Sequence, residues 1–268
     1  MRTERYGPAT DQVADLWLPD GDLPETGWPV VVLVHGGFWR HQYVRDLTEP
    51  LARDLARRGF AVWNVEYRRV PPPDRVIPDE DRGGWPNTLL DVAAAVDALA
   101  DLDAPLDLTR VAVVGHSAGG HLALWLAGRS RLPAGAVGAA PRLVPTVAVG
   151  LAPVADLRRG ERDGMGSGAM ADLLGGASSD VPERWDLADP VQLVGHGVPV
   201  LLVHGEDDDS VPLAQSEAYA AAVTAVGDEV ELLVDTCEHM AVIDPDEPLW
   251  QRAAAWLEQR CDAAPAHS

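Results

Sequence analysis

This 268-residue chain has only two cysteines and no lysine. Cys237 and Cys261 are too few for a secreted domain stapled by disulfides, and they show no zinc-type spacing. Every basic side chain other than histidine is arginine. That bias is typical of GC-rich coding sequences and says nothing about mechanism.

Positive charge is scarce as well. The 21 basic residues are outnumbered by 42 acidic ones, and the formal net charge is −21. Nucleic acids and anionic membranes both favour basic surfaces, so neither is expected as a partner. A solvated acidic surface accounts for the excess, which bears mainly on solubility.

Long apolar runs are also missing, because none approaches the roughly 18 residues of a membrane span. Residues 1–12 are charged and lack the apolar centre of a signal peptide. We therefore expect a soluble, cytoplasmic protein.

What the chain does contain is an alternation of short apolar runs with helical patterns. Continuous Val/Leu runs are typical of strands buried on both faces. Their alternation with helices predicts an α/β fold, with a mostly parallel central sheet and helices on both faces. Such sheets place ligand sites at the carboxyl ends of their strands. The expected strands are 30–34, 60–65, 111–114, 146–151, 200–203 and 231–234, and the expected helices are 47–58, 88–100, 118–128, 215–226 and 248–260.

We expect a single domain over residues 1–268, since α/β folds of this length often form one. Residues 68–84 carry three consecutive prolines and are predicted to be a surface excursion. Residues 153–199 are rich in Gly, Asp and Pro. They are predicted to be a variable segment over the mouth of the functional site, with a short helix near 169–174. The tail, 262–268, is expected to be frayed.

The strongest motif is GHSAG at residues 115–119, between an expected strand and an expected helix. In this context G-x-S-x-G predicts a nucleophile elbow, a sharp turn on which a serine stands between small neighbours. The helix N-terminus beneath the turn favours developing negative charge. Ser117 is the predicted nucleophile, and the alternative is a glycine-rich turn with an incidental serine.

A second motif, HGGFW at residues 35–39, follows the first expected strand. It matches the loop that supplies N–H donors to the oxyanion of a tetrahedral intermediate. Each such donor is worth on the order of 3 kcal/mol. We assign the oxyanion hole to the backbone N–H groups of Gly37, Phe38 and Ala118. The alternative is a turn that needs glycine for a positive φ.

Three consecutive aspartates follow the strand expected at 200–203. The related pattern H-G-x-x-D-x-x-V-P selects Asp208, which lies three residues before Val211. Asp209 and Asp207 remain alternatives. An acidic, solvated loop accounts for those that are not used.

His239 follows the last expected strand, and only the tail residue His267 is also a histidine downstream of the aspartates. The chain order Ser117, Asp208, His239 is the Ser…Asp…His order found with a nucleophile elbow. His239 is predicted to take the serine proton and pass it to the leaving group, while Asp208 holds the ring tautomer. The alternative is an ordinary surface histidine.

The other histidines near the motifs are expected to be structural. His35 and His204 are predicted to brace their glycine loops, and His116 and His121 to pack beside the elbow. No helix carries an H-E-x-x-H pair, so no metal and no other cofactor is expected.

Trp39, Trp185 and Met240 are candidates for a substrate pocket. Core packing is an equal alternative for the two tryptophans.

These motifs resemble those of the α/β-hydrolase superfamily, and within it those of small bacterial carboxylesterases and kynurenine formamidases. HGGFW is similar to their oxyanion loop, GHSAGGHLA to their elbow, and EHMAVIDP to their terminal histidine segment. The likeness runs from about residue 30 to residue 256. It implies the α/β-hydrolase fold without a large cap domain.

Residues and resemblance together predict a serine hydrolase that cleaves small or aromatic carboxylic esters through an acyl-enzyme intermediate. An arylformamidase, acting on N-formyl aromatic amines with the same residues, is the alternative. Met240 departs from the formamidase pattern, which has an aromatic residue after the histidine. A non-catalytic ligand-binding protein of the same fold is a remote alternative, although it would be expected to lack a triad residue. The expected partner is a small-molecule ester or amide, and the sequence leaves the oligomeric state open.

Overall fold

A computed structural model of the chain describes residues 1–262. Its eight strands form one sheet in the order β1-β2-β4-β3-β5-β6-β7-β8. β1 and β2 run antiparallel to their neighbours, and the strands from β4 to β8 are parallel to one another. The strands are β1 (Arg2–Arg5), β2 (Val13–Trp17), β3 (Trp28–Val34), β4 (Ala61–Val65), β5 (Leu106–His116), β6 (Val147–Leu151), β7 (Val200–Gly205) and β8 (Val230–Asp235).

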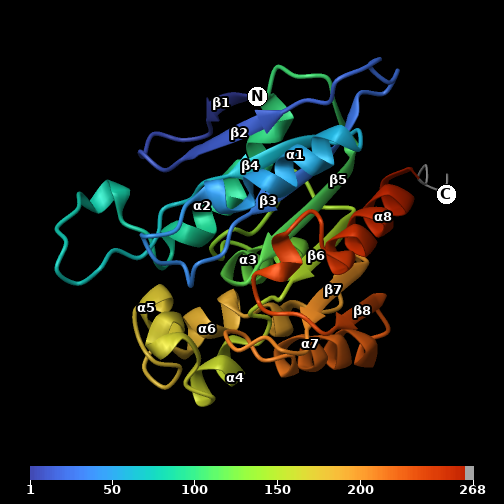
Figure 1. The fold of residues 1–268 in the computed structure, drawn as a ribbon. Coiled ribbons are helices and arrows are strands. Elements are labelled where there is room, and N and C mark those ends of the chain that lie inside the picture. Colours follow the sequence, from blue (N-terminus) through green and yellow to red (C-terminus); the bar gives the residue numbers. More distant parts are fainter. Residues whose placement is uncertain (263–268) are drawn as a thin grey trace.

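Helices cover both faces of this sheet, as Figure 1 shows. The α-helices are α1 (Glu49–Arg57), α2 (Asn87–Asp97), α3 (Ala118–Gly128), α4 (Leu157–Arg162), α5 (Ala169–Leu174), α6 (Pro182–Ala188), α7 (Ala214–Ala225) and α8 (Pro248–Asp262). Short 3-10 helices are η1 (Arg45–Thr48), η2 (Asp79–Asp81), η3 (Ala98–Asp101), η4 (Arg129–Arg131), η5 (Met165–Gly168), η6 (Pro190–Leu193) and η7 (Ala241–Ile243). This architecture confirms the predicted α/β fold, and residues 1–262 contain no large cap domain.

The alternating side chains of β3 divide the core in two. Val30 and Val32 pack into the cluster that includes α2, α3 and α7. Val31 and Leu33 point the other way, into the cluster that includes α1 and α8. Because both faces of the strand are buried, its sequence is apolar throughout instead of alternating.

Two strands were not predicted from the sequence. β1 has the sequence RTER, which has no apolar residue to mark it as a strand. β2 is a short VADLW segment that buries only Ala14 and Leu16. Their antiparallel pairing extends the sheet beyond β4, so the missed strands lie at one edge.

The two segments predicted to interrupt the pattern meet in space. Residues 153–199 fold into α4, α5 and α6 with two 3-10 helices, and Figure 1 shows these helices grouped at one end of the molecule. The helix expected at 169–174 is α5. The N–H of Trp85, at the end of the proline-rich excursion, donates to the carbonyl of Leu173 at 2.6 Å.

The division into a single domain with a variable segment stays a prediction. From residue 263 onward, the tail that was expected to be frayed lies outside the described residues. None of the helices within residues 1–262 is long and apolar enough to cross a membrane.

Candidate active site

The candidate nucleophile stands on a strained turn between β5 and α3. Ser117 has φ 57° and ψ −119°, which is unusual for a residue with a side chain. Its N–H donates to Leu151 at 2.8 Å, and its carbonyl accepts the N–H groups of His121 and Val154 at 3.1 Å each. These three bonds hold a conformation that costs on the order of 1–3 kcal/mol.

The glycines of the elbow are required by close packing. A Cβ at Gly115 would lie 2.0 Å from the carbonyl oxygen of Gly119. A Cβ at Gly119 would lie 2.1 Å from the carbonyl oxygen of Val34. Both distances are far inside van der Waals contact, so α3 can approach β3 and β5 this closely only with glycine at these positions.

Asp208 and His239 are brought together from the loops after β7 and β8. His239 Nδ1 lies 2.6 Å from Asp208 Oδ2. The other carboxylate oxygen, Oδ1, accepts the N–H groups of Ser210 and Val211 at 2.9 and 2.8 Å. The Asp208 side chain has no exposed surface, whereas Asp207 and Asp209 are exposed.

The electrostatics of this loop keep Asp208 ionised. Burial alone would raise the pKa of its carboxyl group, but hydrogen bonds from His204, His239 and the Val211 N–H lower the pKa well below its usual range. His204 is itself buried, with Nε2 donating to the Val211 carbonyl at 2.8 Å. It therefore braces this loop, as a structural histidine was expected to do.

His116, which precedes the nucleophile, supports His239. Burial and the nearby His239 lower the pKa of His116 to about 3, so its ring is neutral near pH 7. Its Nε2 donates to the His239 carbonyl at 3.1 Å, and the two rings lie 4.6 Å apart. The sequence predicted packing here, but nothing in it pointed to a bond across 123 residues.

In the described part of the chain, no hydrogen bond joins Ser117 Oγ to His239. Bonds between a nucleophile and its base are often long before substrate binds. The structure thus brings Asp208 and His239 into contact, and the roles of all three residues stay predictions.

The HGGFW loop has an unusual backbone. Gly37, Phe38 and Trp39 have φ values of 106°, 50° and 56°. Within residues 1–262, the N–H groups of Gly37 and Phe38 donate to no carbonyl or side chain. Gly36 lies against the elbow, because a Cβ on it would be 3.0 Å from Ser117 Cβ. Free N–H groups are thus placed in a loop that packs beside Ser117.

A buried ionic network of His35, Glu66 and Arg69 anchors the HGGFW loop. His35 Nε2 donates to Glu66 Oε1 at 3.0 Å, and Arg69 Nη1 lies 3.0 Å from the same oxygen. Tyr67 stacks on the His35 ring at 4.4 Å and donates its hydroxyl to the His35 carbonyl at 2.9 Å. The sequence predicted a bracing role for His35 but gave no sign of its partner, Glu66, which lies 31 residues away.

The three pocket candidates are in different environments. Trp39 and Trp185 are fully buried; Trp39 packs edge-on against His121, and Trp185 donates to the Gly176 carbonyl at 3.1 Å. Met240 is 50% exposed. A role for any of them in substrate binding stays a prediction. Residues 1–262 contain no group of three His, Cys, Asp or Glu side chains that could hold a metal ion.

A family model and several known proteins match this chain. The BD-FAE family model matches residues 14–223. Esterase LipQ of Mycobacterium tuberculosis is 28% identical over 235 residues, covering 83% of this chain and 52% of its own length. Esterase LipC of the same organism is 29% identical over 232 residues, with 82% and 54% covered. The chain therefore spans about half the length of the curated relatives it matches.

Solved structures show the same fold. An inhibited esterase B from Lactobacillus rhamnosis superposes with a TM-score of 0.78 at 23% identity, covering 98% of this chain and 86% of that protein. Butyrate-bound esterase Est2 from Thermogutta terrifontis superposes with a TM-score of 0.73 at 19% identity, with 96% and 92% covered. These likenesses confirm the predicted α/β-hydrolase fold.

Proposed function

Because this chain belongs to the BD-FAE family and has the α/β-hydrolase fold, we propose that it is a serine hydrolase acting on small or aromatic carboxylic esters. The observation that carries this proposal is the contact between Asp208 and His239, in loops at the same end of the parallel strands as the elbow that bears Ser117. The two mycobacterial relatives, both named esterases, support an ester as the substrate.

The proposed reaction begins when Ser117 Oγ attacks the ester carbonyl carbon and His239 accepts the serine proton. The ionised Asp208 stabilises the imidazolium that forms. The carbonyl oxygen becomes an oxyanion, which accepts hydrogen bonds from the N–H groups of Gly37, Phe38 and Ala118. These donors are already free, so they need no reorganisation when the charge develops.

The intermediate then collapses. The bond from the acyl carbon to the alcohol oxygen breaks, and His239 returns its proton to the departing oxygen. A water molecule next attacks the acyl-enzyme while His239 takes one of its protons. The bond from the acyl carbon to Ser117 Oγ then breaks, and His239 returns its proton to that oxygen as the carboxylic acid is released, so atoms and protons balance over the cycle.

Replacement of the nucleophile tests this function directly. We expect Ser117→Ala to lower kcat for p-nitrophenyl butyrate by roughly 10⁴-fold or more, because no other side chain in the scheme can form the acyl-enzyme. A phosphonate reagent should label Ser117 alone, as mass spectrometry of the digested protein would show. The exposed Ser179→Ala is the matched control, with wild-type turnover and labelling expected. Labelling at another serine, or turnover retained in Ser117→Ala, would disprove the assignment.

Ester preference over formamide is a separate prediction. An alcohol or phenol oxygen is the better leaving group, whereas an amine departs only once His239 has protonated its nitrogen. We expect a higher kcat/KM for phenyl acetate than for N-formylkynurenine in the same preparation. A formamide advantage of tenfold, about 1.4 kcal/mol in transition-state binding, would favour the arylformamidase instead.

The cytoplasmic location and the absence of nucleic-acid and membrane partners stay predictions, to be checked by cell fractionation and by binding assays.

A further inference from the structure

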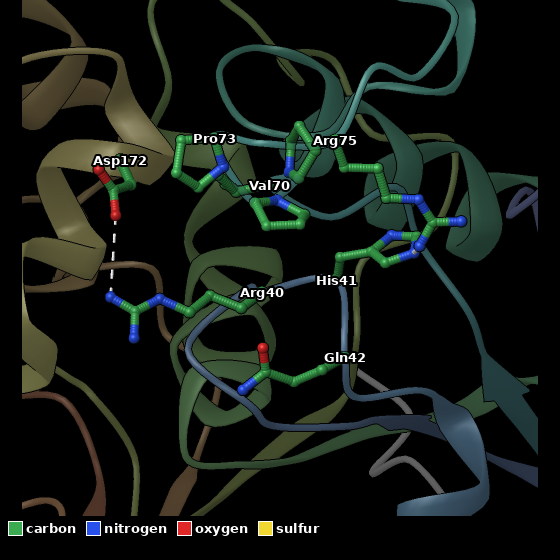
Figure 2. A pocket seen from close by; sticks show the side chains of 9 residues that line it. Arg40, His41, Gln42, Val70, Pro73, Arg75 and Asp172 are labelled. Atoms are coloured by element: carbon green, nitrogen blue, oxygen red, sulfur yellow. Dashed lines mark hydrogen bonds and ion pairs between the residues drawn. The ribbon is translucent and has the colours of Figure 1, made fainter.

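A hollow of about 660 Å³ lies beside the oxyanion loop, and Ser117 is not among its lining residues. One wall is formed by residues 40–42, which directly follow the HGGFW loop, and another by residues 70–73 and Arg75 of the proline-rich excursion (Figure 2). Two backbone bonds join these walls: the Val70 N–H donates to the Trp39 carbonyl at 2.8 Å, and the His41 N–H to the Val70 carbonyl at 3.1 Å. The hollow is therefore attached to the oxyanion loop by its own backbone.

The hollow begins close to the candidate reaction centre. Arg40 is two residues from Phe38, so their Cα atoms are at most about 7 Å apart. The Arg40 N–H also donates to the Gly37 carbonyl at 3.0 Å, which keeps the turn tight. A substrate whose carbonyl oxygen binds the N–H of Phe38 has this hollow within reach of its other end.

Two arginines line the hollow. Arg40 donates from Nη2 to the Gly166 carbonyl at 2.8 Å and lies 3.8 Å from the carboxylate of Asp172, the ion pair drawn in Figure 2. Arg75 Nη1 donates to His41 Nε2, and Arg75 forms no ion pair with any carboxylate in residues 1–262.

His41 orients the Arg75 guanidinium and, as a neutral ring, adds no positive charge beside it. Desolvation first, and then the positive charges of Arg75 and Arg69, lower the pKa of His41. The neutral ring accepts a hydrogen bond from one guanidinium nitrogen. The remaining N–H groups of Arg75 are left for a ligand, and a guanidinium presents them in a fork that fits a carboxylate.

The rest of the wall suits a flat or apolar group. Pro71, Pro72 and Pro73 offer three rings whose backbone φ is fixed and which carry no N–H. Such a surface can pack against an aromatic ring or a short aliphatic stem without losing conformational entropy. Cavities of this volume are in the usual range for small-molecule sites.

We propose that this hollow is a subsite for a carboxylate group on the substrate. The carboxylate is carried by an aromatic ring or short apolar stem that packs on the three prolines, and the guanidinium of Arg75 binds it. The inference rests on the proposed function, because the carboxylate belongs to an ester whose carbonyl carbon is attacked by Ser117. The carboxylate is on either the leaving group or the acyl group, and the experiment distinguishes these two.

The first test compares 4-acetoxybenzoate with 4-acetoxybenzamide, a neutral ester of nearly the same shape. Arg75→Gln should lower the ratio of their kcat/KM values about tenfold, mainly by raising KM for the charged ester. Arg75→Lys should retain part of the ratio, since it keeps the charge and loses the fork. The ratio is taken within each variant, so a general loss of activity cancels.

A second test, for a carboxylate on the acyl group, compares kcat/KM for mono-4-nitrophenyl glutarate with that for 4-nitrophenyl pentanoate. A drop confined to this pair places the carboxylate on the acyl group, and a drop confined to the benzoate pair places it on the leaving group. Arg82→Gln is the matched control, because Arg82 is exposed on the same excursion but does not line the hollow. Its ratios should equal those of the wild type.

The inference is overturned if both ratios in Arg75→Gln match the wild type, or if Arg82→Gln lowers them as much. Calorimetry with 4-acetamidobenzoate, which is not an ester, separates this result from a failure of the proposed function. The anion should bind the wild type and lose about tenfold in affinity in Arg75→Gln. If the wild type binds 4-acetamidobenzoate through Arg75 but hydrolyses no ester, the proposed hydrolase function is refuted and the subsite is not. Binding of this anion that does not depend on Arg75, or no binding together with unchanged ratios for both ester pairs, would refute the subsite.

Discussion

At the scale of single residues, Asp208 is held by donors on both carboxylate oxygens. The backbone of its own loop supplies two of them, and His239 supplies the third at 2.6 Å. Asp207 and Asp209 have the same chemistry but are exposed to solvent. Burial and directed donors, not residue type, thus distinguish the three.

Asparagine substitution along this loop tests that distinction. Asp208→Asn should lower kcat by roughly 10⁴-fold, because an amide cannot hold the His239 tautomer or stabilise its imidazolium. Asp207→Asn and Asp209→Asn, the matched controls, should retain kcat within a few-fold. The measurement is steady-state hydrolysis of p-nitrophenyl butyrate by all three variants. A larger loss at Asp209 than at Asp208 would show that the pairing is misassigned.

At the scale of elements, the neighbouring strands β3 and β4 bring the oxyanion loop and Glu66 together. The strands are parallel, so the residues that follow them meet at the same edge of the sheet. Burial opposes ionisation of Glu66, but the hydrogen bond from His35 and the charge of Arg69 outweigh it and lower the pKa of its carboxyl group. A charged carboxylate therefore anchors the loop whose strained residues carry the oxyanion donors.

Glu66→Gln should lower kcat about tenfold to a hundredfold with little change in KM, because the donors lose their preorganised position. The variant should also bind a boronic acid inhibitor, which mimics the tetrahedral intermediate, correspondingly less tightly. Asp91→Asn is the control: it removes an equally buried carboxylate, 2.6 Å from Arg68 Nη2, that does not contact His35. We expect it to lower the melting temperature while kcat stays near wild type. If kcat and melting temperature fall together in both variants, Glu66 has only a structural role and the prediction is wrong.

At the scale of the whole molecule, one buried carboxyl group couples stability to pH. Asp189 accepts the N–H groups of Leu157 and Arg158, at the start of α4, at 3.1 and 3.4 Å. Burial raises the pKa of its carboxyl group to about 7. The folded chain therefore binds this proton more tightly than the unfolded chain, in which the pKa is about 4.

The sign of the pH effect follows from this difference. Between about pH 4 and the folded value, the folded state holds more protons, so the contribution of Asp189 to the free energy of unfolding falls as pH rises. Asp189→Asn should remove this dependence. Compared with wild type, its melting temperature should therefore be relatively higher at pH 8 than at pH 5. Melting curves of both proteins at the two pH values give the result, and an unchanged difference would contradict the assignment.

The sequence by itself determined the order and type of most elements and named the residues of the candidate site. Apolar runs, helical periodicity and glycine-bounded turns are local signals, so β3, β5 and α3 could be predicted from a few adjacent letters each. The elbow motif and the order of serine, aspartate and histidine are likewise linear features. The described strands β1 and β2 escaped prediction because they are short and carry few apolar residues.

Only the tertiary structure decided which of these residues touch. The bonds from Glu66 to His35, from His116 to the His239 carbonyl and from Asp189 to the start of α4 all join residues at least 31 positions apart. The same is true of the hollow, whose two walls come from separate segments that are joined by the pairing of Val70 with the residues after the oxyanion loop. Such contacts depend on the order of the strands in the sheet and on how the helices pack against it. That order depends on burial summed over the whole chain and not on any local pattern.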